Sequence, residues 1–313
     1  MGYDELNRLK TKAYEGATAS VPSPGTVTYT YDTSTPAQSF AKGKLVRIVD
    51  GSGSSDFVYD KLGRLITESK TLDGSTYTIQ RSYDLLGRLT ALTYPDSEVA
   101  RYTYNTQGGI ETIALQSPTA GTTSLISNLD YNAAGQLTRT AYANGVTTTQ
   151  TYDANTLRLA TIKTQGPAGP LQDFSYAFDR VGNVTGIGDA AHTGTQSFAY
   201  DALNRLTLAT GSYGSAAYQY DPLGNLLQKE GMALGYGLAD GSKPHAATAL
   251  TMPGRAPVTL RYDADGNLLE KPSPESSLLG SAFTYDVENR LVEARTAQED
   301  SVTVTFAPGW NFF

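Results

Sequence analysis

The residues that could support covalent or acid–base catalysis are few and widely separated. A nucleophilic triad requires a histidine base, and the chain contains two, His192 and His245. His192 lies in an Ala-His-Thr-Gly segment that is typical of a solvated loop, and His245 follows a proline, where we expect it to pack or to form a structural hydrogen bond. The chain has no cysteine, which excludes thiolate nucleophiles, thiolate metal sites and disulfides. The sequence therefore predicts no catalytic residue.

Metal and phosphate sites are predicted to be absent as well. The segment 263–267, Asp-Ala-Asp-Gly-Asn, resembles the start of a calcium loop but lacks the downstream bidentate glutamate. The glycine-rich segments 51–55 and 166–170 are not followed by the Lys-Ser/Thr or helix start of a phosphate loop, so we interpret them as hairpin connections. The 31 acidic residues make chance carboxylate pairs inevitable, and a hydrolase using such a pair is the weakest functional hypothesis. No cofactor is predicted.

Most of the remaining chemistry-bearing side chains belong to an internal repeat. The heptapeptide Tyr-Asp-Lys-Leu-Gly-Arg-Leu at 59–65 returns as Tyr-Asp-Leu-Leu-Gly-Arg-Leu at 83–89. There are ten regular copies, which begin at Tyr3, Tyr59, Tyr83, Tyr104, Tyr131, Phe178, Tyr200, Tyr220, Tyr262 and Tyr285, and degenerate copies begin at Tyr31 and Tyr152. Such self-similarity indicates a repeat architecture.

Two positions of the repeat predict a tight turn. The second is always Asp or Asn, whose side chain can accept backbone N–H bonds two residues on: Asp4, Asp60, Asp84, Asn105, Asn132, Asp179, Asp201, Asp221, Asp263 and Asp286. The fifth is always Gly or Asn, which tolerate positive φ: Asn7, Gly63, Gly87, Gly108, Gly135, Gly182, Asn204, Gly224, Gly266 and Asn289. A type I turn followed by a left-handed residue closes a hairpin with a bulge.

The first and seventh positions are predicted to form the repeat core. An aliphatic seventh residue opens the returning strand, as in Leu9, Leu65, Leu89, Ile110, Leu137, Val184, Leu206, Leu226, Leu268 and Leu291. The flanking segments alternate in the manner of strands, and no stretch has a helical period. We expect an all-β chain of tandem hairpins in one long antiparallel meander, with the recurring tyrosines stacked in rows.

Charge excludes several classes of partner. The net charge is -7, and the Lys and Arg residues are spread singly, so neither nucleic acid nor an anionic membrane surface is a predicted partner. No apolar run approaches the length of a membrane span, so membrane insertion is not expected. The chain begins within a repeat and shows no signal peptide, so we expect any export signal to lie upstream.

The heptapeptide with its Gly-Arg-Leu or Gly-Asn-Leu ending resembles the Rhs/YD-repeat family, which includes bacterial polymorphic toxins, wall-associated proteins, the C component of Tc toxins and the teneurins. The segment Lys-Pro-His-Ala at 243–246, in the long gap between Tyr220 and Tyr262, is similar to the insertion before the last repeats of Rhs proteins. The resemblance implies an open spiral or partial cocoon of sheet that encloses a toxin polypeptide. It also implies a bacterial protein that is secreted or displayed at the cell surface.

This chain departs from the family after Tyr285, because the closing segment with its Asp-Pro-x-Gly cleavage motif and any toxin are missing, so self-cleavage is not expected.

We predict a single repeat array at 1–306, an irregular insertion at about 230–258 and an irregular tail at 307–313. The first functional hypothesis is a non-enzymatic shell fragment whose partner is the rest of the shell or an enclosed polypeptide. The second is a surface adhesin that binds glycans through exposed aromatic rows. Free edges, above all the segment 302–306, predict docking or self-association.

Overall fold

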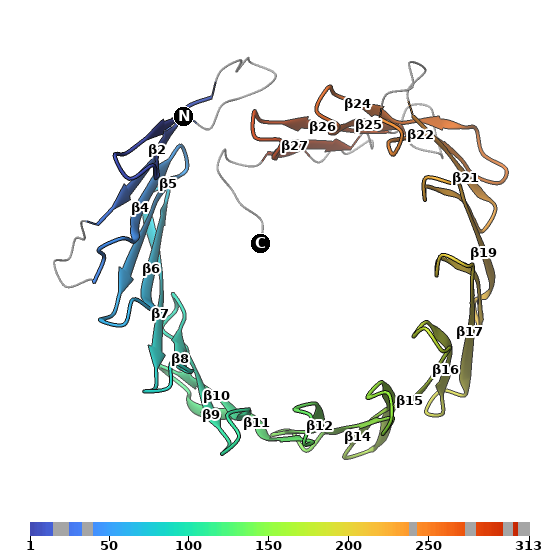
Figure 1. Ribbon diagram of the computed structural model, residues 1–313, viewed down its shortest axis with the longest axis horizontal. Coiled ribbons are helices and arrows are strands. Elements are labelled where there is room, and N and C mark those ends of the chain that lie inside the picture. The colour runs from blue at the N-terminus through green and yellow to red at the C-terminus, as the bar shows by residue number, and fades with distance from the viewer. Residues whose placement is uncertain (15–24, 33–39, 238–242, 273–279, 297–302, 306–313) are drawn as a thin grey trace. The chain divides into compact units, whose positions relative to one another are not determined.

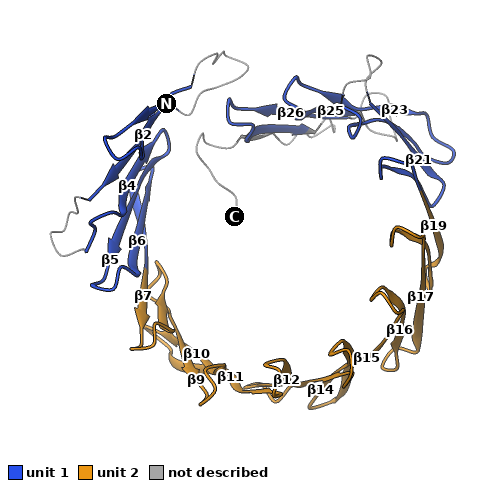
Figure 2. Cartoon of the chain, in the orientation of Figure 1, with its two compact units in different colours: residues 1–79, 220–313 blue, residues 80–219 orange. Residues whose placement is uncertain are grey.

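The chain folds into antiparallel strands joined by turns. The computed structural model describes residues 1–14, 25–32, 40–237, 243–272, 280–296 and 303–305, and in these ranges it contains no helix. Contacts divide the chain into two compact units, residues 80–219 and residues 1–79 with 220–313 (Figure 2). Figure 1 follows the strands in chain order. The prediction of an all-β fold is confirmed.

The strands of the first half are short and regularly spaced. They are β1 (Gly2–Tyr3), β2 (Leu9–Lys12), β3 (Val27–Tyr31), β4 (Leu45–Asp50), β5 (Gly53–Tyr59), β6 (Leu65–Leu72), β7 (Ser75–Tyr83), β8 (Leu89–Thr93), β9 (Val99–Tyr104), β10 (Ile110–Ser117), β11 (Gly121–Tyr131), β12 (Leu137–Tyr142), β13 (Thr147–Tyr152) and β14 (Leu159–Gly166). Each motif tyrosine ends a strand, and each aliphatic seventh residue begins the next.

The second half follows the same plan. Its strands are β15 (Gly169–Phe178), β16 (Val184–Asp189), β17 (Gly194–Tyr200), β18 (Leu206–Gly211), β19 (Gly214–Tyr220), β20 (Leu226–Lys229), β21 (Met232–Tyr236), β22 (Ala247–Thr251), β23 (Val258–Thr259), β24 (Arg261–Tyr262), β25 (Leu268–Pro272), β26 (Gly280–Tyr285), β27 (Leu291–Thr296) and β28 (Thr303–Thr305). The structure describes only the backbone of 303–305.

Consecutive strands pair with one another, as the meander requires. Strands β1 to β23 form one 23-stranded sheet, and β24 to β28 form a second, five-stranded sheet. The interruption is local, because the backbone N–H of Leu260 donates to Thr248 O and the Tyr262 hydroxyl donates to Ala247 O. The repeat pattern therefore continues through it.

The register shows the bulged hairpin that the turn residues predict. Tyr59 pairs with Leu65, the register shifts between Val58 and Tyr59, and the Gly63 N–H donates to Asp60 O at 2.9 Å. The fifth residue of each regular repeat has positive φ, as predicted: Asn7, Gly63, Gly87, Gly108, Gly135, Gly182, Asn204, Gly224, Gly266 and Asn289. A left-handed residue after a type I turn gives the bulge.

The segment 230–258, expected to interrupt the repeats, continues the ladder in its described residues. Strand β21 pairs with β22, and β22 with β23. Tyr236 ends β21 as a motif tyrosine would, and the next residue, Gly237, has φ 76°. In its described residues the segment therefore contains the paired strands β21 to β23, and β21 also pairs with β20.

Among the described residues the sheet is a single layer, without the second packed layer of most domains. Apart from β23 with β25, the extensive contacts join neighbouring strands of the ladder. The buried apolar residues are correspondingly small: Val27, Ala41, Val46, Ala91, Ala100, Ala141, Ala209, Ala216, Val258 and Val292. Burial arises from side chains that stack along the sheet, so every repeat depends on its neighbours.

The C-terminal strand, expected at 302–306, is β28. It pairs with β27, with Thr303 opposite Arg295 and Thr305 opposite Glu293. The predicted tail at 307–313, with Trp310, Phe312 and Phe313, lies outside the described residues.

Candidate functional site: the ladder of repeat turns

The aspartate in the second position of each repeat organises its turn. Asp60 Oδ1 accepts the backbone N–H of Leu62 at 2.9 Å and of Arg64 at 3.0 Å, while Oδ2 accepts Arg64 Nε at 2.7 Å. The same contacts recur around Asp4, Asp84 and Asp201, and Asn105 and Asn132 keep the two backbone contacts. These carboxylates are structural groups with occupied acceptor sites.

The sixth position, which sequence reasoning did not single out, completes the turn and reaches the next one. Arg8 donates Nε to Asp4, and its terminal nitrogens donate to Asp32 of the following repeat. Asn183 Nδ2 likewise bonds Asp179 at 2.8 Å and Asn204 of the next turn at 2.9 Å. Because the sixth residue varies among Arg, Asn, Gln and Gly, only its pairing with the second position could have revealed this role.

The motif tyrosines link one repeat to the preceding one. The Tyr59 hydroxyl donates to Leu45 O at 2.8 Å, Tyr104 to Leu89 O at 2.6 Å, and Tyr200 to Val184 O at 2.7 Å. The same bond is formed by Tyr31, Tyr131, Tyr152, Tyr236 and Tyr262. Cations lie over several tyrosine rings, with Arg8 Cζ 4.4 Å from the Tyr31 ring centre, Arg88 Cζ 4.4 Å from that of Tyr104 and Lys44 Nζ 5.8 Å from that of Tyr59. The abundance of tyrosine thus follows from these structural roles.

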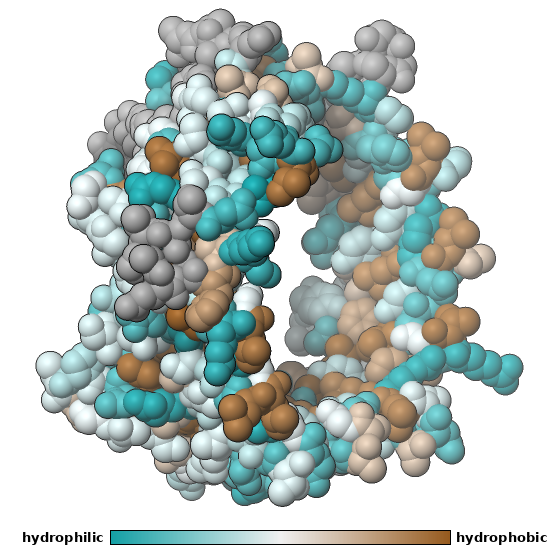
Figure 3. Space-filling view, turned by 60° about the vertical axis from the view of Figure 1, so that its left-hand side comes forward, coloured by the Kyte–Doolittle hydropathy of each residue, from teal (hydrophilic) through white to brown (hydrophobic). Residues whose placement is uncertain are grey.

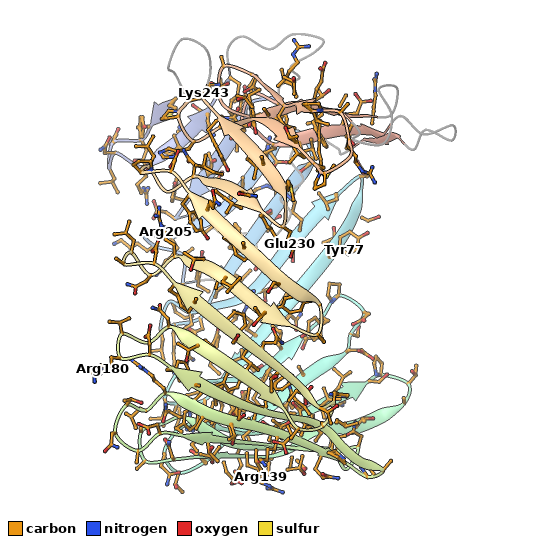
Figure 4. The ribbon with its side chains drawn as sticks, turned by 90° about the vertical axis from the view of Figure 1, so that its right-hand side faces the viewer. Tyr77, Arg139, Arg180, Arg205, Glu230 and Lys243 are labelled. Atoms are coloured by element: carbon orange, nitrogen blue, oxygen red, sulfur yellow. The ribbon has the colours of Figure 1, made fainter. Side chains whose placement is uncertain are left out.

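The motif turns lie along one edge of each unit, because each follows a strand that runs in the same direction. In residues 80–219, Arg180 and Arg205 mark this edge (Figure 4). The fourth residue of many turns points away from the fold as a large aliphatic side chain. Six are 62% to 78% exposed: Leu6, Leu62, Leu86, Val181, Leu203 and Leu223. The turns thus present regularly spaced apolar side chains to the surroundings.

Two pockets lie between successive turns within residues 80–219. One, of about 700 Å3, lies between the Asn105 and Asn132 turns and includes Gly109 and Tyr131. The other, of about 530 Å3, lies between the Asp153 and Asp179 turns and includes Arg158, whose guanidinium donates to Asp179 O at 2.8 Å. The first pocket lies beside a repeat whose sixth residue is Gly109, and the second lies beside the degenerate copy that begins at Tyr152.

The two histidines occupy the environments that the sequence suggests. His192 is an exposed loop residue whose Nδ1 lies 2.8 Å from Asp189 Oδ2. His245 is exposed, and its Nδ1 lies 2.7 Å from Asn225 Oδ1, while Asn225 Nδ2 also donates to Pro244 O. The Lys-Pro-His-Ala segment therefore docks on the turn of the Asp221 repeat.

Within the described residues, no three His, Asp or Glu side chains gather as metal ligands. Across the same ranges, no helix has the length and apolarity to cross a membrane.

The turn contacts hold the pKa of Asp4, Asp32, Asp84 and Asp201 below the ordinary value. Acceptance of the Arg88 backbone N–H is the main cause of the lowered pKa of Asp84, and the corresponding contact lowers the pKa of Asp4 and Asp201. The Arg8 guanidinium, followed by the Gly43 N–H, lowers the pKa of Asp32 to about 2. The folded state therefore favours the ionised form of these groups.

Acid should destabilise the fold through these turns. A carboxyl with a lowered folded pKa contributes stability that is present above its unfolded pKa and lost as pH falls through its folded pKa. We therefore expect the urea midpoint to be level from pH 7 to about pH 5 and to fall from about pH 4 towards pH 2. A triple variant Asp60→Asn, Asp84→Asn, Asp201→Asn should show a shallower fall, and equal slopes would contradict the prediction.

Comparisons with known proteins agree with the repeat. A family model described as RHS Repeat matches residues 131–168. Toxin subunit YenC2 of Yersinia entomophaga is 40% identical over 111 residues, which cover 30% of this chain and 11% of that protein. Toxin subunit YenC1 of the same organism is 30% identical over 151 residues, which cover 43% of this chain and 16% of that protein. The chain thus matches a small part of these curated relatives.

The fold is that of a part of solved Tc toxin structures. In the crystal structure of TcdB2-TccC3, the matched chain has a TM-score of 0.65 and 19% identity, with coverage of 91% of this chain and 20% of that chain. In the Tc holotoxin pore of Photorhabdus luminescens, the TM-score is 0.63 and the identity 20%, with coverage of 92% and 19%.

Proposed function

Because the chain is an Rhs/YD-repeat protein, we propose that it is a non-enzymatic part of a structural shell that encloses another polypeptide. The observation that carries the proposal is the set of exposed aliphatic side chains on the motif turns. The fold does not need them, since their turns are held by the Asp and Gly positions and their tips pack on little. Exposed apolar groups of this kind mark surfaces that contact other chains.

The spacing of these side chains suits an unfolded polypeptide better than a folded partner. Figure 3 shows separate hydrophobic patches among hydrophilic ones, and no broad apolar face is seen in that view. Each of these six turns offers a small contact, and at Leu86 and Leu203 it lies beside an ionised Asp–Arg pair. Many weak, separated contacts hold an extended chain without imposing one structure on it. We infer secretion with the enclosed chain, as the toxin-subunit relatives suggest.

The test uses the purified chain and fluorescently labelled, reduced and carboxymethylated α-lactalbumin, a soluble polypeptide without a fixed fold. We expect binding by fluorescence anisotropy, at least about tenfold weaker in the triple variant Leu86→Ser, Val181→Ser, Leu203→Ser. The matched control is Leu125→Ser, Leu171→Ser, Leu208→Ser, which changes exposed leucines on strands β11, β15 and β18 of the same unit. Absence of binding, or equal weakening in both triples, would overturn the proposal.

The adhesin hypothesis has a different signature. The exposed tyrosines outside the motif include Tyr77 and Tyr213, at 50% and 56% exposure, and stacking on sugars would use them. A glycan panel probed with the wild-type chain, in which binding is lost in Tyr77→Ala, Tyr213→Ala, would replace the shell proposal with the adhesin.

A further inference from the structure

The turns follow a pairing rule between their second and sixth residues. Where the second residue is Asp, the sixth supplies a donor, as Arg88 Nε does to Asp84 at 2.7 Å and Asn225 Nδ2 does to Asp221 at 2.7 Å. Where the second residue is Asn132, the sixth supplies an acceptor, because Asn132 Nδ2 donates to Gln136 Oε1 at 2.9 Å. Complementary hydrogen-bonding groups thus meet in each pair.

The Asn132 turn shows how a glutamine joins two turns. Gln136 accepts from Asn132 with its oxygen and donates with Nε2 to Leu157 O at 2.8 Å. Leu157 is the left-handed residue of the following turn, with φ 56°. The carboxamide is therefore held by one donor and one acceptor on successive turns.

The preceding turn has the same second residue but no sixth side chain. Asn105 Oδ1 accepts the N–H groups of Gln107 and Gly109 at 3.1 and 2.9 Å, which fixes the amide so that Nδ2 faces the side of the turn where a sixth side chain would lie. A Cβ placed on Gly109 would lie 3.3 Å from this Nδ2 and 3.0 Å from the Tyr131 ring. The 700 Å3 pocket opens at this position.

The pocket contains the partners that a carboxamide would need. Asn105 lines one side, and Gly135, the left-handed residue of the following turn, lines the other, in the place that Leu157 takes one repeat later. Tyr131 also lines the pocket, and its hydroxyl is engaged with Ile110 O at 3.0 Å. Asn105 and Gly135 thus occupy positions equivalent to those of Asn132 and Leu157, the two partners of Gln136.

The charged residues at the pocket determine which ligand residues are favoured next to a bound carboxamide. The charged residues among those that line it are Glu111 and Asp130, and Asp130 is only loosely paired with Arg139, at 3.4 Å. A cationic neighbour on a ligand would be attracted, and a carboxylate would be repelled.

We propose that this pocket binds a glutamine side chain of another polypeptide, flanked by basic residues. The glutamine oxygen accepts from Asn105 Nδ2, its nitrogen donates to the carbonyl of Gly135, and its methylene groups lie on the Tyr131 ring. The volume, within the usual range for ligand pockets, admits the side chain together with parts of its neighbours. The partner thus supplies the sixth residue that this repeat lacks.

The first test is a set of short peptides, titrated into the full chain and followed by NMR shifts of the Asn105 side-chain amide. N-acetyl-Lys-Gln-Lys-amide is expected to bind, and the peptides with Ala or Glu in place of Gln are expected to bind at least about tenfold more weakly. The Glu peptide keeps the acceptor but loses the donor to Gly135. Equal affinity for the three peptides would show that the pocket recognises only the flanking lysines, and it would overturn the proposal.

The second test reverses the pairing rule. Asn105→Asp retains the turn, since aspartate stands at this position in most repeats, but replaces the donor by an acceptor. We expect about tenfold weaker binding of the Gln peptide and tighter binding of N-acetyl-Lys-Arg-Lys-amide. Gly109→Gln should fill the pocket from within and abolish peptide binding.

A sugar site would behave differently from a glutamine site in these experiments. Unchanged Gln binding in Asn105→Asp, or binding of free N-acetylglucosamine but of no peptide, would overturn the proposal, the latter in favour of a sugar site. The leucine triple variants leave the pocket intact, so failure of the shell proposal and failure of this one are measured independently.

Discussion

Replacement of Gly53 by alanine is expected to lower the free energy of unfolding by more than about 3 kcal/mol, the combined scale of backbone strain and overpacking. Gly53 begins β5 with φ 142°, and a Cβ there would lie 1.9 Å from the backbone oxygen of Thr71 on β6. A backbone oxygen cannot rotate away as a side chain would, so the two strands must separate. Urea unfolding and hydrogen exchange in β5 and β6 measure the effect.

Gly74 provides the matched control. It lies in the turn between β6 and β7 with φ 80°, but a Cβ at this position has no heavy atom within 4 Å. Gly74→Ala should therefore cost only the left-handed backbone penalty of about 1 kcal/mol. If the two variants lose equal stability, the contact with Thr71 contributes nothing and the register of β5 on β6 needs revision.

Replacement of Asp286 by alanine is expected to cost about 3 kcal/mol, because it removes a buried carboxylate that accepts three hydrogen bonds. Asp286 is 2% exposed and accepts the N–H groups of Glu288 and Arg290 at 2.8 and 3.0 Å, as well as Arg290 Nε at 2.9 Å. All three donors lose their acceptor in the variant. Hydrogen exchange in β26 and β27 should rise most.

Two further variants show which contact matters. Asp286→Asn keeps an acceptor for the two backbone N–H groups and should lose clearly less stability than Asp286→Ala. Asp130→Ala removes a half-exposed carboxylate paired with Arg139 at 3.4 Å and should change stability by less than about 0.5 kcal/mol. A loss in Asp130→Ala as large as that in Asp286→Ala would show that burial is not the reason.

The hydrogen bonds that join Lys12 and Tyr14 to Glu288, within the unit formed by residues 1–79 and 220–313, could not have been predicted from the sequence. Lys12 and the Tyr14 hydroxyl both bond Glu288, which lowers the pKa of this carboxyl against the opposing effect of its burial. Lys12 and Glu288 lie 276 residues apart in the sequence. Their separation along the chain leaves no periodic signal, so only the folded backbone brings the groups together.

The sequence by itself determined the hairpin repeat, its strands and its turns. Asp at the second position and Gly or Asn at the fifth act on backbone groups within a few residues. Their effect is therefore local and can be predicted from a single sequence. The positive φ of Gly63 and Asn204 follows from the residue type together with its position, the fifth of the repeat. The all-β class follows from the alternation between these turns.

Tertiary structure alone decided what joins one repeat to the next. The Tyr104 hydroxyl donates a hydrogen bond to Leu89 O, and Gln136 Nε2 donates one to Leu157 O, because paired strands bring these groups together in space. The pocket at Gly109 exists for the same reason, since a missing side chain leaves a space only when the two neighbouring turns are fixed in place. Contacts between repeats depend on register, and register is a property of the assembled sheet.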